Sequence, residues 1–273
     1  MGRIRVGLSG WRYKGWRGDF YPPGLPQRRE LAYVAEKFDT VEINGSFYSL
    51  KSPSNYRSWA SEVGEDFVFA VKGGRFITHM KQLRDVTVGL ANFYASGVLA
   101  LGHALGPTLW QLPARMRYEP QRMRDFLEVL PATAEAAAAL AAGHDDKVKD
   151  PWTEAGLDRP VRHAIEVRHE SFADQSFFDV LRTHGVGLVV THGDASWPLL
   201  EEVTTDLMYV RLHGAPDLYA SGYSDEDLAG WAAKVREWSK AADVYVYLDN
   251  DARGHAPWDA KRLGALLDQD APA

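Results

Sequence analysis

Short runs of β-branched and aromatic residues alternate with longer segments of helical period along the chain. The expected strands cover residues 3–8, 40–44, 67–72, 108–112, 163–169, 187–192, 207–213 and 244–249. The expected helices cover residues 27–38, 54–63, 80–101, 120–142, 175–183, 225–239 and 257–267. The connection at residues 194–206, between the sixth and seventh strands, has only a weak helical signal.

Eight strand units in 273 residues predict an α/β fold, namely a single TIM-like (β/α)8 barrel domain over residues 1–273 with irregular loops at its C-terminal rim. A doubly wound open sheet is the alternative, and it would normally carry a glycine-rich phosphate turn after the first strand. Gly7, Gly10 and Gly15 do not form that motif, and the sequence contains no P-loop motif. The barrel is therefore the favoured fold.

Strand periodicity predicts which side chains point into this barrel, because successive side chains of a strand alternate between its two faces. Val41 and Ile43 share one face of the second strand, whereas Glu42 and Asn44 share the other. Five strands show this alternation, so we expect the apolar set to meet the helices and the polar set to face the barrel axis. The expected polar lining consists of Glu42, Asn44, Lys72, Gln111, Glu166, Arg168, Arg211, His213 and Asp249, ringed by Trp11, Tyr48 and Tyr247.

The polar residues lie late in their strands, toward the rim where TIM-barrel enzymes carry their active sites. In the sixth strand the inward residue is either Thr191 or His192. A purely structural network of neutralising ion pairs is the alternative interpretation of the polar lining. The candidates for acid–base catalysis are Glu42, Glu166, His213 and Asp249, and the candidates for clamping an anion are Lys72, Arg168 and Arg211.

Three loops could contribute ligand contacts. The loop after the first strand contains Trp11 and Tyr13 and could either cover a ligand or pack as a rim plug. The loop after the third strand contains paired glycines at 73–74, which permit close backbone approach to an anion, and then His79. The loop after the eighth strand contains Asn250 and lies where TIM barrels often hold phosphate. Other lone histidines, such as His163, are expected at the surface or at helix caps.

Composition narrows the classes of protein. The chain has 31 Lys and Arg against 37 Asp and Glu, and a net charge of −6, which argues against binding nucleic acid through bulk charge. The absence of cysteine excludes thiol nucleophiles, cysteine-ligated zinc, iron–sulfur clusters and disulfides. The sequence shows no signal peptide and no apolar stretch long enough to span a bilayer, so we expect a soluble, cytoplasmic protein without a membrane partner.

Several motifs follow one another along nearly the whole chain. They include Gly7-Leu8-Ser9-Gly10-Trp11, Val41-Glu42-Ile43-Asn44, Trp110-Gln111-Leu112-Pro113, Ile165-Glu166-Val167-Arg168 and Arg211-Leu212-His213-Gly214. In this combination the sequence resembles the YecE-like family, which is widely labelled a domain of unknown function. The family's eighth strand commonly ends in Phe-Asn-Asn, whereas this chain has Leu248-Asp249-Asn250. The resemblance implies a TIM-like barrel but supplies no reaction.

Three functional hypotheses follow from the residues. The favoured one is an enzyme of hydrolase or isomerase type that acts on a small polar, anionic metabolite and needs no cofactor. The first alternative is a nucleotide- or nucleic-acid-binding module that uses the basic and aromatic rim without turnover. The second is a divalent-metal-dependent hydrolase, and it is disfavoured because nearby arginines already supply positive charge. Its ligands would be Glu166, His213 and Asp249 with His192.

Overall fold

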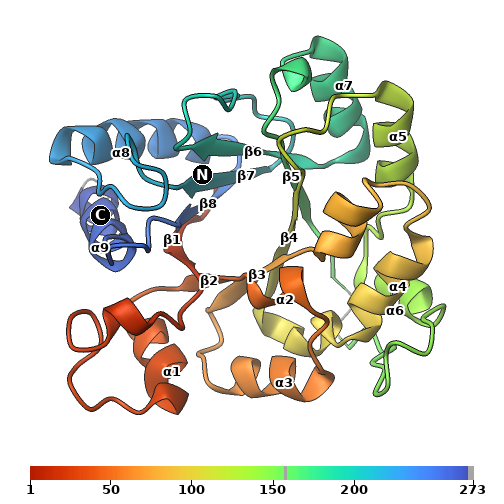
Figure 1. The fold of residues 1–273 in the computed structure, drawn as a ribbon, viewed down its shortest axis with the longest axis horizontal. Helices are drawn as coiled ribbons and strands as arrows, with labels where there is room; N and C mark the ends of the chain where they lie inside the picture. The colour runs from red at the N-terminus through yellow and green to blue at the C-terminus, as the bar shows by residue number, and fades with distance from the viewer. Residues whose placement is uncertain (157–158, 270–273) are drawn as a thin grey trace.

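A closed barrel of parallel strands forms the centre of the molecule, with helices around it (Figure 1). The structure is a computed structural model that describes residues 1–156 and 159–269. In this part of the chain the strands pair in the order β1 to β8, and β1 closes the barrel against β8. The strands are β1 (Ile4–Ser9), β2 (Thr40–Ile43), β3 (Val68–Lys72), β4 (Leu105–Gln111), β5 (His163–Glu166), β6 (Gly187–His192), β7 (Leu207–Leu212) and β8 (Asp243–Leu248). The expected TIM-like fold is confirmed.

Helices connect most of the strands. They are α1 (Glu30–Ala35), α2 (Gly45–Tyr48), α3 (Pro53–Ser61), α4 (Thr87–Ala95), α5 (Pro120–Glu128), α6 (Ala134–Ala141), α7 (Gln175–His184), α8 (Asp225–Ser239) and α9 (Ala256–Gln269). Short 3-10 or π turns cover Lys14–Trp16, Gln27–Arg29, Phe76–Met80, Val98–Ala104 and Glu170–Phe172. Residues 193–206 contain no helix, in agreement with the weak helical signal there. No helix among the described residues has both the length and the hydropathy that a membrane span requires.

Two of the expected helices are wrong in extent because local backbone geometry interrupts them. The segment expected as one helix at 80–101 forms α4 and, after Gly97, the start of the 3-10 turn at Val98–Ala104. Before α4, Gln82, Leu83 and Asp85 adopt positive φ angles of 49°, 68° and 48° that interrupt a helix. Gly97 ends that helical segment with a φ of 111°. A Cβ at Gly97 would lie 2.5 Å from Pro53 Cα, so the turn also needs glycine for space.

The segment expected as one helix at 120–142 divides into α5 and α6. Pro131 lies between the two helices and cannot donate the backbone hydrogen bond that a continuous helix needs there. Thr133 then caps α6, and its side chain accepts a hydrogen bond from the backbone N–H of Ala136 over 3.1 Å. The two short helices follow the barrel surface where one long helix would overshoot it.

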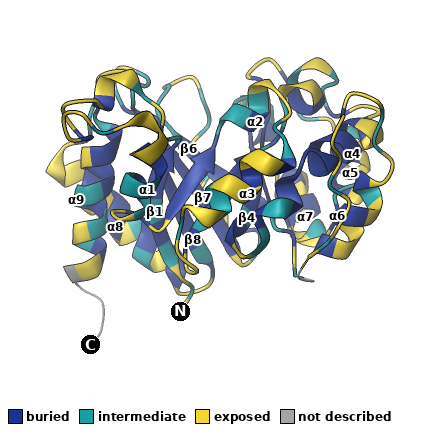
Figure 2. Cartoon of the chain, turned by 90° about the horizontal axis from the view of Figure 1, so that it is seen from below, coloured by how far each residue is buried: buried dark blue, intermediate teal, exposed yellow. Residues whose placement is uncertain are grey.

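The alternation along the strands separates two apolar cores, of which only the one against the helices was predicted. The larger core lies between strands and helices and includes Val41, Ile43 and Phe69. The smaller core fills the barrel and includes Ala70 and Tyr209. The strands are accordingly buried on both faces, whereas the helices expose their outer faces (Figure 2). Beyond the smaller core, at the C-terminal ends of the strands, polar side chains occupy the barrel interior.

Tyr247 does not ring the barrel opening as expected. It is fully buried inside the barrel, and its hydroxyl lies 2.7 Å from Thr40 Oγ1. The smaller core thus closes the lower part of the interior, and any ligand must approach from the C-terminal ends of the strands.

Candidate active site

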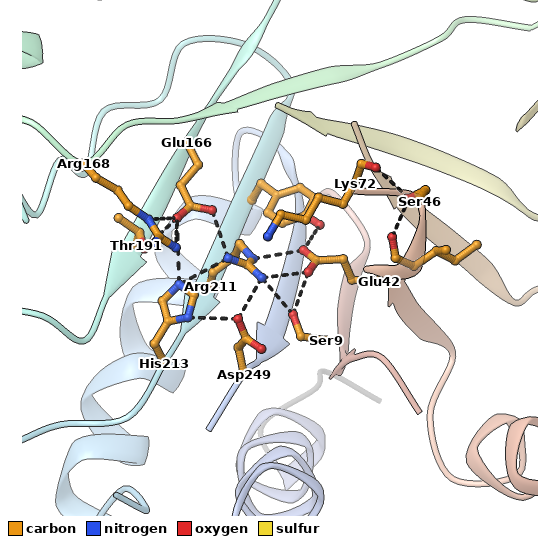
Figure 3. Close-up of polar contacts among 12 residues, drawn as sticks. Ser9, Glu42, Ser46, Lys72, Glu166, Arg168, Thr191, Arg211, His213 and Asp249 are labelled. Atoms are coloured by element: carbon orange, nitrogen blue, oxygen red, sulfur yellow. Dashed lines mark hydrogen bonds and ion pairs between the residues drawn. The ribbon is translucent and has the colours of Figure 1, made fainter. Parts of the chain in front are cut away.

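Arg211, near the end of β7, is the centre of a buried charged network at the C-terminal opening of the barrel, which we call the mouth (Figure 3). Its Nε and Nη2 donate to the two carboxylate oxygens of Glu42 over 3.0 and 2.8 Å, and its Nη1 donates to Glu166 over 3.0 Å. Nη2 also donates to Asp249 over 2.8 Å and to Ser9 Oγ over 3.1 Å. Every guanidinium nitrogen therefore has a partner within the protein.

Parallel register places the two glutamates on opposite sides of this arginine. Glu42 pairs with Ser9 between β1 and β2, and the Ser9 hydroxyl donates to it over 2.7 Å. Tyr209 also donates to Glu42, over 2.6 Å. Glu166 pairs with Gln111 between β4 and β5. Both glutamate side chains are 0% exposed, so their negative charge is balanced by protein groups and not by bulk water.

Arg168 supplies the second cation of the network. Its Nε and Nη2 both lie 2.7 Å from Glu166 Oε1. Its guanidinium is stacked on Trp197, with the guanidinium carbon 3.8 Å from the ring centroid. Trp197 also contacts the ring of His213 edge-on, with centroids 5.5 Å apart. The loop before β7 thereby fixes Arg168 at the edge of the mouth.

The charges in the network perturb its titratable groups. Burial alone would raise the pKa of Glu166, but the positive charges of Arg168 and Arg211 outweigh it and hold this pKa well below its usual range. Burial is likewise outweighed at Asp249, where the charge of Arg211 and a hydrogen bond from His213 lower the pKa. Both carboxylates are therefore ionised at neutral pH.

His213 is held neutral in the same network. Burial lowers its pKa, and the charge of Arg211 lowers it further. Its Nε2 lies 3.3 Å from Arg211 Nη1, which is a donor, so Nε2 accepts. Its Nδ1, 3.0 Å from Asp249 Oδ2, then carries the proton. His213 is completely buried, which makes it a link between Arg211 and Asp249.

Lys72, at the end of β3, differs from the two arginines because its amine has no acidic partner. No ion pair within 4.0 Å forms between Lys72 and any residue that the structure describes, although its amine points toward the network (Figure 3). Burial and then the charge of Arg211 lower the pKa of Lys72 from 10.5 to about 8, against the opposing pull of Glu42 and Glu166. Ser46 holds the strand end in place by donating to the Lys72 carbonyl over 2.6 Å.

The other rim residues lie around the mouth at different depths. Tyr13 donates to the Ser9 carbonyl over 2.5 Å, and Asn44 has a buried Oδ1 without a hydrogen-bond partner in the described structure. Both line a cavity of about 320 Å³ beside the mouth. Trp11 lines it too, but its ring packs between Trp59 and the barrel and does not ring the mouth.

Tyr48 and His79 both pack against the ring of Phe47. Tyr48 is 71% exposed, and its ring lies 5.1 Å from that of Phe47. His79 packs edge-on against Phe47 at 5.0 Å, and burial followed by the charge of Lys72 lowers its pKa to about 4. Gln111 is nearly buried at the end of β4, beside Glu166.

The sixth strand contributes Thr191 and not His192 to the barrel interior. Thr191 pairs with Arg211 in the register of β6 and β7, and its hydroxyl lies 3.5 Å from Glu166 Oε1. His192 faces α8, with Nδ1 2.9 Å from the Tyr223 hydroxyl. The disfavoured metal-dependent alternative included His192 as a ligand, and the structure does not bring this residue to the other three. Within residues 1–156 and 159–269, no three His, Cys, Asp or Glu side chains are grouped so that they could hold a metal ion.

Asn250, which is an expected ligand contact, is held by hydrogen bonds within the protein. It is completely buried, and its Nδ2 donates to the Ser221 carbonyl over 3.0 Å and to Asp259 Oδ2 over 2.8 Å. This amide therefore ties the loop after β7 to the start of α9. The neighbouring Asp251, for which the sequence predicted no role, has two buried carboxyl oxygens without hydrogen-bond partners among the described residues.

Two further expectations fail because Trp110 packs behind the sheet. A Cβ at Gly73 would lie 2.2 Å from the Trp110 ring, so this glycine makes room for an indole and not for an anion. His163 is buried instead of exposed, because its Nδ1 accepts from Trp110 Nε1 over 3.2 Å. Its Nε2 lies 2.9 Å from the Pro131 carbonyl.

Three members of the site are missing from the expected polar lining. Ser9 and Tyr209 both bond Glu42, and Trp197 stacks on Arg168. Tyr209 shares the face of Arg211 along β7, so the alternation places it inside the barrel, but its contact with Glu42 was not expected. Trp197 lies in a loop without periodicity, and no sequence signal placed it.

The fold and this network define a (β/α)8-barrel protein with a charged C-terminal mouth. Residues 5–273 match the family model described as "Protein of unknown function DUF72", and the chain belongs to this family. The resemblance to the YecE-like family is thereby confirmed.

Relatives and solved structures agree with this assignment. The chain is 33% identical to UPF0759 protein YunF of Bacillus subtilis over 97% of this chain and 95% of that protein. It is 22% identical to UPF0759 protein YecE of Escherichia coli K12 over 93% and 89%. The crystal structure of a DUF72 family protein from Thermotoga maritima matches with a TM-score of 0.79 at 25% identity, covering 97% of this chain and 99% of that one. D-psicose 3-epimerase from Clostridium cellulolyticum shares the fold alone, with a TM-score of 0.50 at 11% identity over 98% of each chain.

Proposed function

We propose that the chain is an enzyme of hydrolase or isomerase type that binds a small anionic metabolite in the mouth of the barrel. The observation that carries this proposal is the amine of Lys72, which points to the charged network without an acidic partner among the described residues. No hydrogen bond or ion pair to a described residue occupies the Lys72 amine, so an anionic ligand can bind it without displacing a carboxylate of the protein.

The residue that contacts the anion is Lys72 and not Arg211. All nitrogens of Arg211 already donate to Glu42, Glu166 or Asp249, so Arg211 acts as a positioning residue. Arg168 is committed to Glu166 by two of its nitrogens but lies at the edge of the mouth, where its side chain is 11% exposed. It therefore serves as a second, weaker contact for the anion.

Acid–base chemistry at this site is assigned to Lys72 and Asp249. A lysine with a pKa of about 8 can both give and take a proton near neutral pH, unlike an ordinary lysine. The Asp249 side chain is 15% exposed, whereas Glu42 and Glu166 are fully buried, so Asp249 is the network carboxylate that a ligand reaches. Its lowered pKa keeps it ionised at neutral pH but makes it a weaker base than an ordinary aspartate. Glu42, Glu166 and His213 hold Arg211 and Asp249 in place.

The first test is thermal unfolding with phosphate, acetate, malate and glycerol 3-phosphate. A ligand at about 100 times its Kd adds about 2.7 kcal/mol, or several degrees in Tm for a protein of this size. We expect at least one anion to raise Tm in the wild type and not in Lys72→Met. The matched control is Lys37→Met, because Lys37 is an exposed lysine that follows the end of α1, away from the mouth. Equal shifts in all three proteins, or no shift with any anion, would contradict the proposal.

The second test concerns turnover. Each stabilising anion is incubated with the protein in deuterated water, and proton NMR follows hydrolysis products or exchange of carbon-bound hydrogen. We expect Lys72→Met and Asp249→Asn to abolish the conversion while Lys37→Met retains it. Anion binding without conversion of any stabilising compound would support a binding module instead of an enzyme.

A further inference from the structure

A groove of about 400 Å³ opens at the C-terminal rim beside the mouth, between α2, the π turn at Phe76–Met80 and α4. Its walls include four of the large apolar side chains that are exposed in the described chain, namely Tyr48, Leu50, Phe76 and Met80. Met80 is 64% exposed and Phe76 43%. Clustered apolar exposure of this kind marks an interaction site, and the volume falls in the range of small-molecule pockets.

The depth of the groove depends on a glycine in α4. A Cβ at Gly89 would lie 3.2 Å from both Phe76 Cδ1 and Ile77 Cγ1, so the missing side chain lets Phe76 settle against the helix. Phe93, on the same helix, is fully packed beneath. The floor of the groove is thus rigid core, while its rim consists of side chains that remain open to solvent.

Phe47 joins this groove to the mouth. Its ring lines the groove, and the Lys72 amine lies 4.7 Å from its centroid. A ligand whose charged end contacts Lys72 is therefore separated from the groove only by the ring of Phe47. This continuity favours a small ligand shared by both places over a separate partner for the groove.

The charge of the groove agrees with an anion. Arg75 lines it and forms no ion pair with any described residue. Lys147 lines it too, but its amine lies 3.1 Å from Asp145 and is therefore already paired. None of the described lining residues is an aspartate or glutamate.

We propose that the groove binds the apolar body of the substrate, which is then an amphipathic anion: a planar or branched apolar group that carries one carboxylate or phosphate. The charged end lies at Lys72 and Arg75, and the apolar body lies on Phe47, Phe76 and Met80. This inference rests on the proposed function, because it takes Lys72 as the anion contact.

The test is isothermal titration with 2-naphthoate, which carries both features, 2-naphthamide, which lacks the charge, and acetate, which lacks the apolar body. We expect 2-naphthoate to bind at least tenfold tighter than either comparison compound. Met80→Ser should weaken 2-naphthoate about tenfold, equivalent to about 1.4 kcal/mol. Val88→Ser is the matched control, because Val88 is 49% exposed on α4 but does not line the groove.

The outcomes separate the inference from the proposed function. If Met80→Ser binds 2-naphthoate as the wild type does, while Lys72→Met loses acetate and 2-naphthoate alike, the groove is not used and the proposed function stands. If 2-naphthamide binds as tightly as 2-naphthoate and Lys72→Met changes neither, the site does not recognise an anion and both proposals are wrong. If Val88→Ser weakens the binding of 2-naphthoate as much as Met80→Ser does, the effect is not specific to the groove. That result would also overturn the inference.

Discussion

Replacement of Lys72 by methionine should stabilise the fold while it removes anion binding. A lowered lysine pKa means that the folded protein disfavours the charged amine relative to the unfolded chain. Methionine has a similar length and no charge, so it relieves that penalty. The carboxylates of the network do not lose their principal partner, because Arg211 bonds all three of them.

The size of the effect follows from the pKa of Lys72. A pKa of about 8, against 10.5 for an ordinary lysine, corresponds to an upper limit of about 3 kcal/mol below pH 8. Partial exposure of the side chain reduces this value, so we expect a gain of about 1–3 kcal/mol. For a protein of this size the gain corresponds to an increase in Tm of several degrees.

The effect of Lys72 on stability depends on pH in a definite direction. Below pH 8 the amine is protonated in both states, and the folded state carries the full penalty. Between pH 8 and 10.5 the folded protein releases the proton while the unfolded chain still binds it, so wild-type stability from this group rises with pH. The advantage of Lys72→Met should therefore be largest near pH 7 and should shrink toward pH 10.

Urea unfolding of the wild type, Lys72→Met and Lys37→Met at pH 7 and at pH 9.5 measures these differences. Lys37→Met should match the wild type at both pH values, because Lys37 lies on the outer surface. A Lys72→Met protein that is less stable than the wild type at pH 7, or whose difference from it is the same at both pH values, would show that the lysine charge carries no penalty in the fold. Lys72 would then be a structural residue.

Three further predictions concern the buried parts of the barrel. Arg211→Met leaves Glu42 as a buried carboxylate without a cationic partner and leaves Glu166 with Arg168 alone. The variant should lower the free energy of unfolding by about 3–5 kcal/mol in urea, and unchanged stability would show that the network is not needed for folding. Gly73→Ala places a Cβ within 2.2 Å of the Trp110 ring and should destabilise the fold by about 1–3 kcal/mol or more, which lowers Tm. An unchanged Tm in a thermal scan would disprove this prediction. Burial lowers the pKa of His163 from 6.5 to about 4, so the unfolded chain binds the proton first and wild-type stability should fall as the pH is lowered from 6.5 to 4. A His163→Gln variant should lose less stability over this range. Equal losses of stability in the wild type and the variant, measured by urea unfolding at pH 7 and 4.5, would contradict the assignment.

Sequence periodicity predicted the barrel and most of its polar lining because both depend on local chain geometry. Alternation along a strand is a property of the backbone, so Glu42, Glu166 and Arg211 could be placed on inward faces without any knowledge of their partners. Helix extent was less predictable. The turn at Gly97 is imposed by contact with Pro53, a residue from another helix.

The roles of the charges depend on the closure of the whole barrel. Glu42 and Arg211 are 169 positions apart in sequence, and whether they meet depends on strand register all the way around the sheet. The same closure gives Arg211 a full set of carboxylate partners and leaves Lys72 without an ion-pair partner among the described residues. The amino-acid sequence thus indicates which side chains face the barrel axis wherever apolar and polar residues alternate clearly, since this follows residue by residue along each strand, whereas the choice between Thr191 and His192 needed the structure. The three-dimensional packing determines which of those charges are neutralised and which one is available to a ligand, since that depends on distances between strands.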